Sequence, residues 1–232
     1  MSLEQVLGML ADGEVHSGEA LGQALGVSRT AVGKQLKKLE GLGGSGLSVK
    51  GQGYQLPGGM ELLQRDKILS CLSERARSLL GDLELHGSID STNVRALEQI
   101  RSGSSQGFVC LAEHQTAGRG RHGRNWVSPF GRNVYLSLVW EFNSGAAALG
   151  GLSLAVGVAI ARALQRNKIP DVELKWPNDV LWRGQKLAGI LLELTGDAAG
   201  RCQVVIGVGV NFGMPCSIGT AVFTQEQRNG QD

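Results

Sequence analysis

The chain has 232 residues, 42% of them hydrophobic, and 23 lysines and arginines against 21 acidic residues give a net charge of +2. This length permits a buried core and favours two units over one, and so small a charge excludes a chain that binds nucleic acid over its whole surface. Neither 18 consecutive apolar residues nor a basic start before an apolar stretch occurs. We therefore expect no membrane span and no signal peptide, and a cytoplasmic protein.

The first part of the chain carries the apolar spacing of three short helices. Leu3 to Leu10 repeat apolar residues at helical intervals, and Gly18 to Leu25 and Ser28 to Leu42 follow. The turn Gly26-Val27-Ser28 contains a glycine, and its serine is well placed to cap the third helix. Two helices joined by such a turn form the helix-turn-helix pattern.

Basic residues gather on the third predicted helix and just after it, where Glu40 is the single acid between Arg29 and Lys50. Such side chains can contact phosphates and base edges in a major groove. The alternation from Leu47 to Leu56 around a glycine turn predicts a β-hairpin wing. A merely solvated basic face is the plainer alternative, but turn, cap and wing together favour DNA binding. The candidate DNA contacts are Arg29, Thr30, Lys34, Lys37 and Lys50.

The remainder of the chain predicts an α+β domain. Pro57-Gly58-Gly59 ends the wing, and residues 61–80 predict a short helical connector. Helices are expected at Ser91–Arg101 and Ala146–Leu164, and with the strands they predict a mixed sheet with helices on one face. We place the DNA-binding unit at 1–63, the second domain at 64–215 and a divergent, disordered tail at 216–232. Strands are predicted at Phe108–Ala112, Val134–Trp140, Val172–Leu174, Val180–Trp182, Ile190–Leu194 and Val204–Val210.

Cysteines and histidines give no sign of a metal centre. No two cysteines form a C-x-x-C pair, so we expect buried, reduced thiols. The histidines show no metal-ligand spacing with one another or with carboxylates, and we predict no zinc site built by the protein. These residues are Cys71, Cys110, Cys202 and Cys216, and His16, His86, His114 and His122.

Two polar segments have compositions that a structural role alone does not explain. Asp90-Ser91-Thr92-Asn93 opens a predicted helix, where hydroxyls, an amide and free backbone N–H groups converge, although capping alone explains one of them. Residues 115–126 follow a predicted strand and interleave glycines with Arg119, Arg121 and Arg124. Glycines let the backbone approach a ligand closely and arginines neutralise phosphate charge, so a phosphate-binding loop is favoured over a flexible solvated one.

Gly118, Gly120 and Gly123 spell G-x-G-x-x-G, the pattern of dinucleotide-binding folds. That fingerprint must open a helix, yet Trp126-Val127-Ser128-Pro129 cannot be the first turns of an amphipathic helix. We reject this interpretation. The chain also contains no G-x-x-x-x-G-K-[ST] loop of ordinary P-loop proteins.

A third polar segment is Lys175-Trp176-Pro177-Asn178-Asp179, followed by Lys186-Leu187-Ala188-Gly189-Ile190. Two tight connections bring two lysines, an amide and a carboxylate together. Turn chemistry explains Asn178 and Lys186 separately, but Asp179 beside an apolar strand start is harder to explain that way. A carboxylate there is suited to hold the magnesium of a nucleotide.

In this order, the three segments resemble the bacterial biotin protein ligase family, whose bifunctional members carry a winged helix-turn-helix in front. The resemblance runs from about Gly13 to Asn211. It implies a class II synthetase-like catalytic domain that activates biotin with MgATP to biotinyl-5'-AMP. The biotinyl group then passes to a lysine of the biotin carboxyl carrier protein of acetyl-CoA carboxylase. It further implies biotin-responsive repression of biotin synthesis genes, by a homodimer that forms with the adenylate and binds operator DNA.

The resemblance also assigns residues to roles. Arg119, Arg121 and Lys186 are implied to be catalytic, and Asp179 to hold the Mg²⁺. The implied nucleotide contacts are Arg119, Trp126, Asn178 and Asp179. The implied biotin contacts are Ser91, Thr92, Asn93, Gln115, Arg119, Gly120, Arg121, Lys186 and Gly189.

Two alternatives stay open from the sequence. The segment after Asn211 departs from the family pattern, which normally continues with an adenylate-covering loop and a small β-barrel, so a non-catalytic biotin-sensing repressor is the second hypothesis. A lipoate or octanoate transferase of related fold is the third, although the Lys175–Asp179 motif and the winged helix favour biotin.

Overall fold

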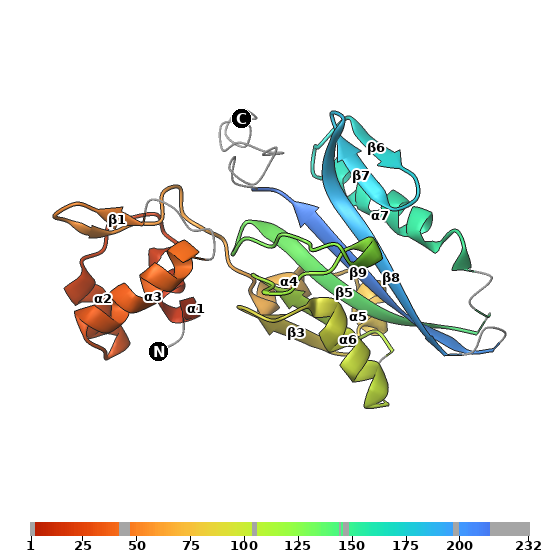
Figure 1. The fold of residues 1–232 in the computed structure, drawn as a ribbon, viewed down its shortest axis with the longest axis horizontal. Coiled ribbons are helices and arrows are strands. Elements are labelled where there is room, and N and C mark those ends of the chain that lie inside the picture. The colour runs from red at the N-terminus through yellow and green to blue at the C-terminus, as the bar shows by residue number, and fades with distance from the viewer. Residues whose placement is uncertain are drawn as a thin grey trace.

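The computed structural model describes residues 3–41, 47–103, 106–143, 145, 149–196 and 200–213. Its N-terminal unit contains the predicted helix-turn-helix and wing (Figure 1). Ser17 and Ser28 cap the second and third helices, accepting hydrogen bonds from Ala20 N and Ala31 N at 3.0 and 3.2 Å. The elements are α1 (Leu3–Leu10), α2 (Gly18–Leu25), α3 (Arg29–Gly41), β1 (Ser48–Val49) and β2 (Gly53–Tyr54).

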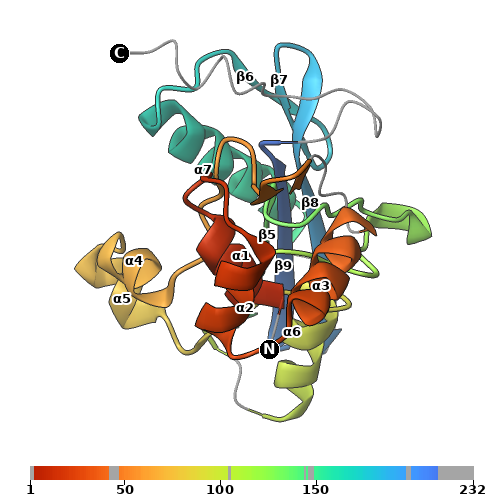
Figure 2. The same cartoon turned by 90° about the vertical axis from the view of Figure 1, so that its left-hand side faces the viewer.

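This unit shares its core with a residue from the second unit. Phe130, far along the chain, is 3% exposed and packs in the cluster formed by the apolar faces of α1, α2 and α3. Figure 2 looks at the molecule from the side of these helices. The cluster comprises Val6, Leu7, Leu10, Leu21, Val32, Leu36, Leu47, Leu56 and Phe130, with Met60 and Leu62 of the connection packed against it.

The two units meet around Glu113 and His114. Glu113 accepts a hydrogen bond from the backbone N–H of Leu63 in the connecting segment. His114 is 7% exposed, stacks on Phe130 with 6.5 Å between ring centroids, and contacts Ser88 Oγ through Nδ1 at 2.9 Å. Burial first, and the charge of Lys38 on α3 second, hold the pKa of His114 below its ordinary value.

The second unit is built on a mixed seven-stranded sheet in the order β3-β4-β5-β9-β8-β7-β6. β3 and β4 pair in parallel and all other neighbours are antiparallel. The helical connector is confirmed as α4 (Arg65–Ser70) and α5 (Glu74–Leu79). The strands are β3 (Leu83–His86), β4 (Val109–Ala112), β5 (Asn133–Phe142), β6 (Val172–Lys175), β7 (Asp179–Trp182), β8 (Gln185–Gly196) and β9 (Cys202–Asn211).

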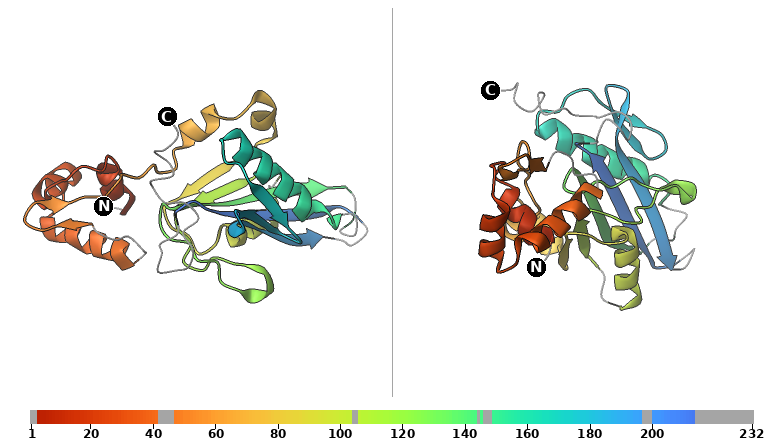
Figure 3. Two further views of the ribbon diagram at one scale, coloured as in Figure 1. Left: turned by 90° about the horizontal axis from the view of Figure 1, so that it is seen from above. Right: turned by 60° about the vertical axis from the view of Figure 1, so that its left-hand side comes forward.

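The expectation that helices cover one face of the sheet is wrong. Helix α6 (Thr92–Arg101) packs on the face that carries Val139 and Val205, whereas α7 (Leu152–Arg166) packs on the face that carries Val208 and Val210. Side chains alternate between the two faces along a strand, so these are opposite sides. Figure 3 shows α7, α4 and α5 on one side of the sheet and α6 on the other.

Two further expectations need correction. Helix α7 begins at Leu152 rather than Ala146, because Gly150 and Gly151 are poor helix formers; residues 146–148 lie outside the described part. Cys110 and Cys202 are buried free thiols, but Cys71 is exposed, and Cys216 lies outside the described residues. Across the ranges described, no helix is long and apolar enough to cross a membrane.

Candidate active site

Glycines of two central strands form the floor of a cavity of about 260 Å³. Gly189 of β8 pairs with Gly209 of β9, and Gly207 lies two residues earlier on the same face. A Cβ atom at Gly209 would lie 2.5 Å from the indole ring of Trp126, and one at Gly207 would lie 2.2 Å from Asn93 Oδ1. Side chains at these positions would collide with Trp126 and Asn93, so the close approach of those two residues to the strands requires glycine.

The start of α6 forms one wall. Ser91, Thr92 and Asn93 are 1–4% exposed, and both the N–H and the hydroxyl of Thr92 donate to Gln115 Oε1, at 2.9 and 3.1 Å. Ser91 stands at the N-cap position but makes no capping hydrogen bond, so capping does not account for it. Ser91, Thr92 and Asn93 all line the cavity, where a polar ligand can be bound.

The glycine-rich loop forms the opposite wall. It is an irregular hairpin: Trp126 N donates to Gly118 O and Gly120 N donates to Arg124 O, at 2.8 and 2.7 Å. Its one helical element is a single 3₁₀ turn, Arg121–Gly123, with His122 in the left-handed region at φ +57°. The segment therefore does not begin a helix, which confirms that it is not a dinucleotide-binding turn.

Two of the loop's arginines that line the cavity have partners outside the loop. Arg119 Nη1 lies 3.3 Å from Glu193 Oε1, and Arg121 Nη1 donates to Asn178 Oδ1 at 3.0 Å. Glu193 also accepts from Asn93 Nδ2 at 2.7 Å, and the Oδ1 of that asparagine accepts from Ser137 Oγ at 2.6 Å. These contacts hold two guanidinium groups at the rim of the cavity.

The third segment completes the site from β7 and β8. Lys186 Nζ and Asp179 Oδ1 form an ion pair at 2.8 Å, and the same ammonium lies 5.2 Å from the centre of the Trp126 ring. Asn178 is fixed by donating from Nδ2 to Ile190 O at 2.8 Å. A carboxylate, an amide, an ammonium and an indole thus meet beside the glycine floor.

The structure places every residue predicted for biotin or nucleotide binding on this one cavity; their individual roles stay predictions. Four lysine and arginine side chains line it and are suited to phosphate oxygens, and the glycine floor is suited to a flat ligand. Sequence reasoning missed Gly207, Gly209 and Leu136, which also line the cavity, and Glu193, which contacts Arg119. Their positions depend on the pairing of β5, β9 and β8, which no local motif reveals.

The candidate DNA contacts lie together on the N-terminal unit. Arg29, Thr30, Lys34 and Lys37 are exposed on α3, and Lys50 is exposed at the turn of the wing. Val32 and Leu36 of the same helix are buried in the core. The helix therefore presents a basic face to solvent and an apolar face to α1 and α2, as a major-groove helix must.

Comparisons with known proteins agree with this geometry. The model of the "Biotin/lipoate A/B protein ligase family" matches residues 85–211, and an "HTH domain" model matches residues 2–55. The "Bifunctional ligase/repressor BirA" of Salmonella typhimurium is 46% identical over 209 residues, and that of Escherichia coli is 44% identical over 210. Each alignment covers 90% of this chain and 63% of the relative, so the chain spans just under two thirds of these relatives.

A solved structure gives the same result. The biotin protein ligase from Aquifex aeolicus in complex with biotin and ATP is 31% identical with a TM-score of 0.52, covering 65% of this chain and 62% of that one. It is similar in fold and in sequence, and the family match spans more than half of this chain. The chain therefore belongs to the biotin/lipoate A/B protein ligase family and carries a helix-turn-helix domain at its N-terminus.

Proposed function

We propose that the second unit activates biotin with ATP to biotinyl-5'-AMP and transfers the biotinyl group to a lysine of the biotin carboxyl carrier protein. The observation that carries this proposal is the convergence of Arg119, Arg121 and Lys186 on a cavity floored by glycines. An adenylation site must gather cations around phosphates and bind a flat, largely apolar acid next to them.

In the first step, a biotin carboxylate oxygen attacks the α-phosphorus of ATP and pyrophosphate leaves. Lys186 is placed to hold the carboxylate and an α-phosphate oxygen together, and the two arginines to stabilise charge on the phosphates. In the structure these cations contact Asp179, Glu193 and Asn178, so they are already oriented before the phosphates replace those contacts.

The biotin itself is assigned to the glycine floor and the start of α6. Ser91, Thr92, Asn93 and Gln115 offer hydroxyl and amide groups for a ureido ring, and Gly189 lets the Trp126 ring lie close to the sheet. In the second step the acceptor lysine amine attacks the biotinyl carbonyl and AMP leaves. The reactive anhydride must be kept from water meanwhile, which the loop over the cavity can do.

Magnesium is implied by the use of ATP, and the cavity offers one carboxylate that could bind it. Asp179 is the carboxylate at the cavity, and it is paired with Lys186. Mg²⁺ is commonly bound by one or two carboxylates, with substrate phosphates and water as the other ligands. Asp179 would hold the ion in this manner, and the ion would neutralise phosphate charge.

We further propose that the N-terminal unit represses biotin synthesis genes in the cytoplasm. The exposed basic face of α3 and the wing support binding to operator DNA. The adenylate would favour a homodimer that places two such helices on a two-fold operator, so that ligand, dimer and DNA are linked.

Biotin-dependent exchange between pyrophosphate and ATP on the purified chain tests the adenylation step, with lipoate run in parallel. Exchange with biotin alone supports a biotin ligase. Preference for lipoate would instead select the related lipoate or octanoate transferase. A chain that binds biotin without exchange would be a non-catalytic biotin-sensing repressor, and the proposed catalysis would be wrong.

A further inference from the structure

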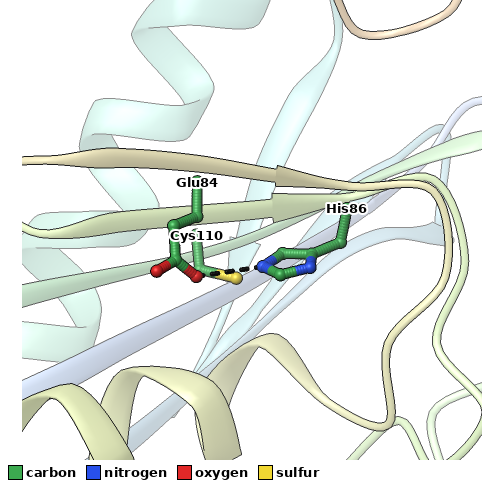
Figure 4. Close-up of side chains that lie close together, drawn as sticks. All are labelled: Glu84, His86 and Cys110. Atoms are coloured by element: carbon green, nitrogen blue, oxygen red, sulfur yellow. Dashed lines mark hydrogen bonds and ion pairs between the residues drawn. The ribbon is translucent and has the colours of Figure 1, made fainter.

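Glu84, His86 and Cys110 bring a carboxylate, an imidazole and a thiol together, apart from the cavity described above (Figure 4). Glu84 and His86 are two residues apart on β3, so their side chains point to the same face of the sheet. The parallel register pairs Glu84 with Cys110 of β4. As a result, the three possible ligand atoms all lie within 4.8 Å of one another.

We propose that these three side chains form a binding site for a divalent cation of the zinc class. One sulfur, one nitrogen and one oxygen ligand suit a borderline-soft ion such as Zn²⁺ better than Mg²⁺ or Ca²⁺, which prefer oxygen alone. The proposal stands independently of the proposed function, because none of the three residues lines the adenylation cavity.

The distances require only small movements. Bonds of about 2.0–2.3 Å in a tetrahedral site set neighbouring ligand atoms roughly 3.3–3.8 Å apart. His86 Nε2 and Glu84 Oε2 are now 3.0 Å apart in a hydrogen bond, and no pair of ligand atoms exceeds 4.8 Å. The ion fits between the three ligand atoms if His86 Nε2 and Glu84 Oε2 move slightly apart and the Cys110 sulfur comes closer to both by about an ångström.

Arg95 of α6 already binds one of the proposed ligands, Glu84, so a metal ion would share that carboxylate with it. Its Nε and Nη2 donate to the two Glu84 oxygens at 2.8 and 2.7 Å. Arg95 also contacts Glu98 at 3.5 Å, Gln99 at 3.2 Å and the Phe108 ring at 5.7 Å. It therefore keeps partners when one Glu84 oxygen turns to the metal, and the other oxygen stays with the guanidinium.

Burial gives the site a fixed end and an open end. Cys110 is fully buried in the core under α6, whereas the side chains of His86 and Glu84 are 31% and 25% exposed. An ion can thus enter from solvent, displace the thiol proton into water and keep a fourth position for a water molecule. Three protein ligands with an open fourth position are typical of accessible zinc sites.

A zinc-class site at Glu84, His86 and Cys110 differs from the expectation, drawn from the sequence, that the protein builds no zinc site. No sign of this site is visible in the sequence, because Glu84-x-His86 supplies only two ligands, which are too few to indicate a metal centre. The third ligand, Cys110, comes from another strand. The parallel pairing of β3 with β4 brings the thiol to them.

The test is a Co²⁺ titration of the untagged 232-residue chain after treatment with a chelator, in the absence of ATP and biotin. Cobalt bound to a thiolate gives a sulfur-to-metal charge-transfer band in the near ultraviolet, and tetrahedral coordination gives intense visible bands. We expect these bands to saturate at a single ion per chain, to disappear on addition of Zn²⁺ and to be unaffected by Mg²⁺.

Variants assign the ligands. Cys110→Ser should abolish the charge-transfer band, and His86→Gln and Glu84→Gln should each weaken cobalt affinity by more than about tenfold. The double variant Cys71→Ser/Cys216→Ser and the cavity variant Asp179→Asn should retain both band and affinity. Absence of the bands, or their persistence in Cys110→Ser, would overturn the proposal. If Cys110→Ser does not fold, unchanged affinity in both His86→Gln and Glu84→Gln would do the same.

Discussion

Arg119 of the glycine-rich loop and Glu193 of β8 form an ion pair, with 3.3 Å between Nη1 and Oε1, although 74 residues separate them in the chain. The same glutamate accepts a hydrogen bond from Asn93 at the start of α6. Glu193 thus connects the loop, the sheet and the helix at one point. No described side chain other than this carboxylate pairs with the Arg119 guanidinium as an ion pair.

Glu193→Gln should slow adenylation because Arg119 loses the charge that orients it. We expect kcat for biotin-dependent pyrophosphate exchange to fall by roughly tenfold, equivalent to about 1.4 kcal/mol, with a smaller change in the KM for biotin. Glu173→Gln, on the exposed edge strand β6, is the matched control and should leave both constants unchanged. Equal kinetics in the two variants would show that Glu193 does not position Arg119.

Lys186→Gln tests the residue assigned to the reacting oxygens. Removing a cation from an adenylation site should lower the exchange rate by roughly 10²–10³-fold, while the fold is kept because the side chain is 44% exposed. Biotin binding measured by calorimetry separates loss of catalysis from loss of affinity. Lys67→Gln, an exposed lysine of the connector, provides the comparison. Exchange at the parent rate in Lys186→Gln would remove this lysine from the mechanism.

Gly209→Ala should close the floor of the cavity. The added Cβ would lie 2.5 Å from Trp126 Cε2, so the indole must move or the strand must shift. We expect the Kd for biotin to rise at least about tenfold and the tryptophan fluorescence to change without ligand. Gly151→Ala, where a Cβ meets open space, should change neither. Parent-like affinity in Gly209→Ala would argue against biotin lying on this strand.

His114 should make stability depend on pH. Its pKa is held below the ordinary 6.5, chiefly by burial, so below that pH the unfolded chain takes up a proton that the folded chain does not. This contribution to stability is therefore present above about pH 6.5 and is lost as the pH falls toward the lowered pKa. The free energy of unfolding, measured with urea at about pH 7.5 and about pH 5.5, should fall less between the two pH values in His114→Asn than in the parent. In His122→Asn, at an exposed loop position, the free energy of unfolding should fall by as much as it does in the parent.

Lys34→Ala and Lys37→Ala test the DNA-binding face of α3. Each should weaken binding to duplex DNA and reduce the slope of log affinity against log salt by about 1, as expected for one lost phosphate contact. Fluorescence anisotropy over a range of salt concentrations gives both quantities. Arg75→Ala removes an equal charge from the exposed connector helix α5 and should leave the slope unchanged. Identical slopes in all three variants would contradict the assignment.

Local patterns in the sequence predicted most helices and strands because apolar periodicity and caps act within a few residues. β3 was missed because the strands of this domain were predicted from apolar runs, whereas Leu83-Glu84-Leu85-His86 alternates apolar and polar residues over only four positions. The side of the sheet on which α6 and α7 lie could not be predicted either. It depends on how the chain crosses between strands, which no local pattern encodes.

The site was predictable where its residues stand in compact polar segments. Ser91–Asn93, the arginine loop and Asn178–Asp179 were found because their composition differs from that of ordinary turns. Gly207, Gly209 and Glu193 were missed because each lies inside a long strand. The register of β8 with β9 brings the two glycines to the cavity and Glu193 to Arg119. Residues such as these become visible when the strand pairing is known.

Phe130 has a consequence for how the protein unfolds. This ring follows the glycine-rich loop in the chain but completes the core of the N-terminal unit, and Met60 and Leu62 of the connection pack around it. The helix-turn-helix cannot lose its structure without exposing an aromatic side chain of the second unit to water, at a cost of roughly 1.5–3 kcal/mol. The two units are therefore thermodynamically coupled, and unfolding of the helix-turn-helix destabilises the segment of the second unit that holds Phe130 and follows the glycine-rich loop.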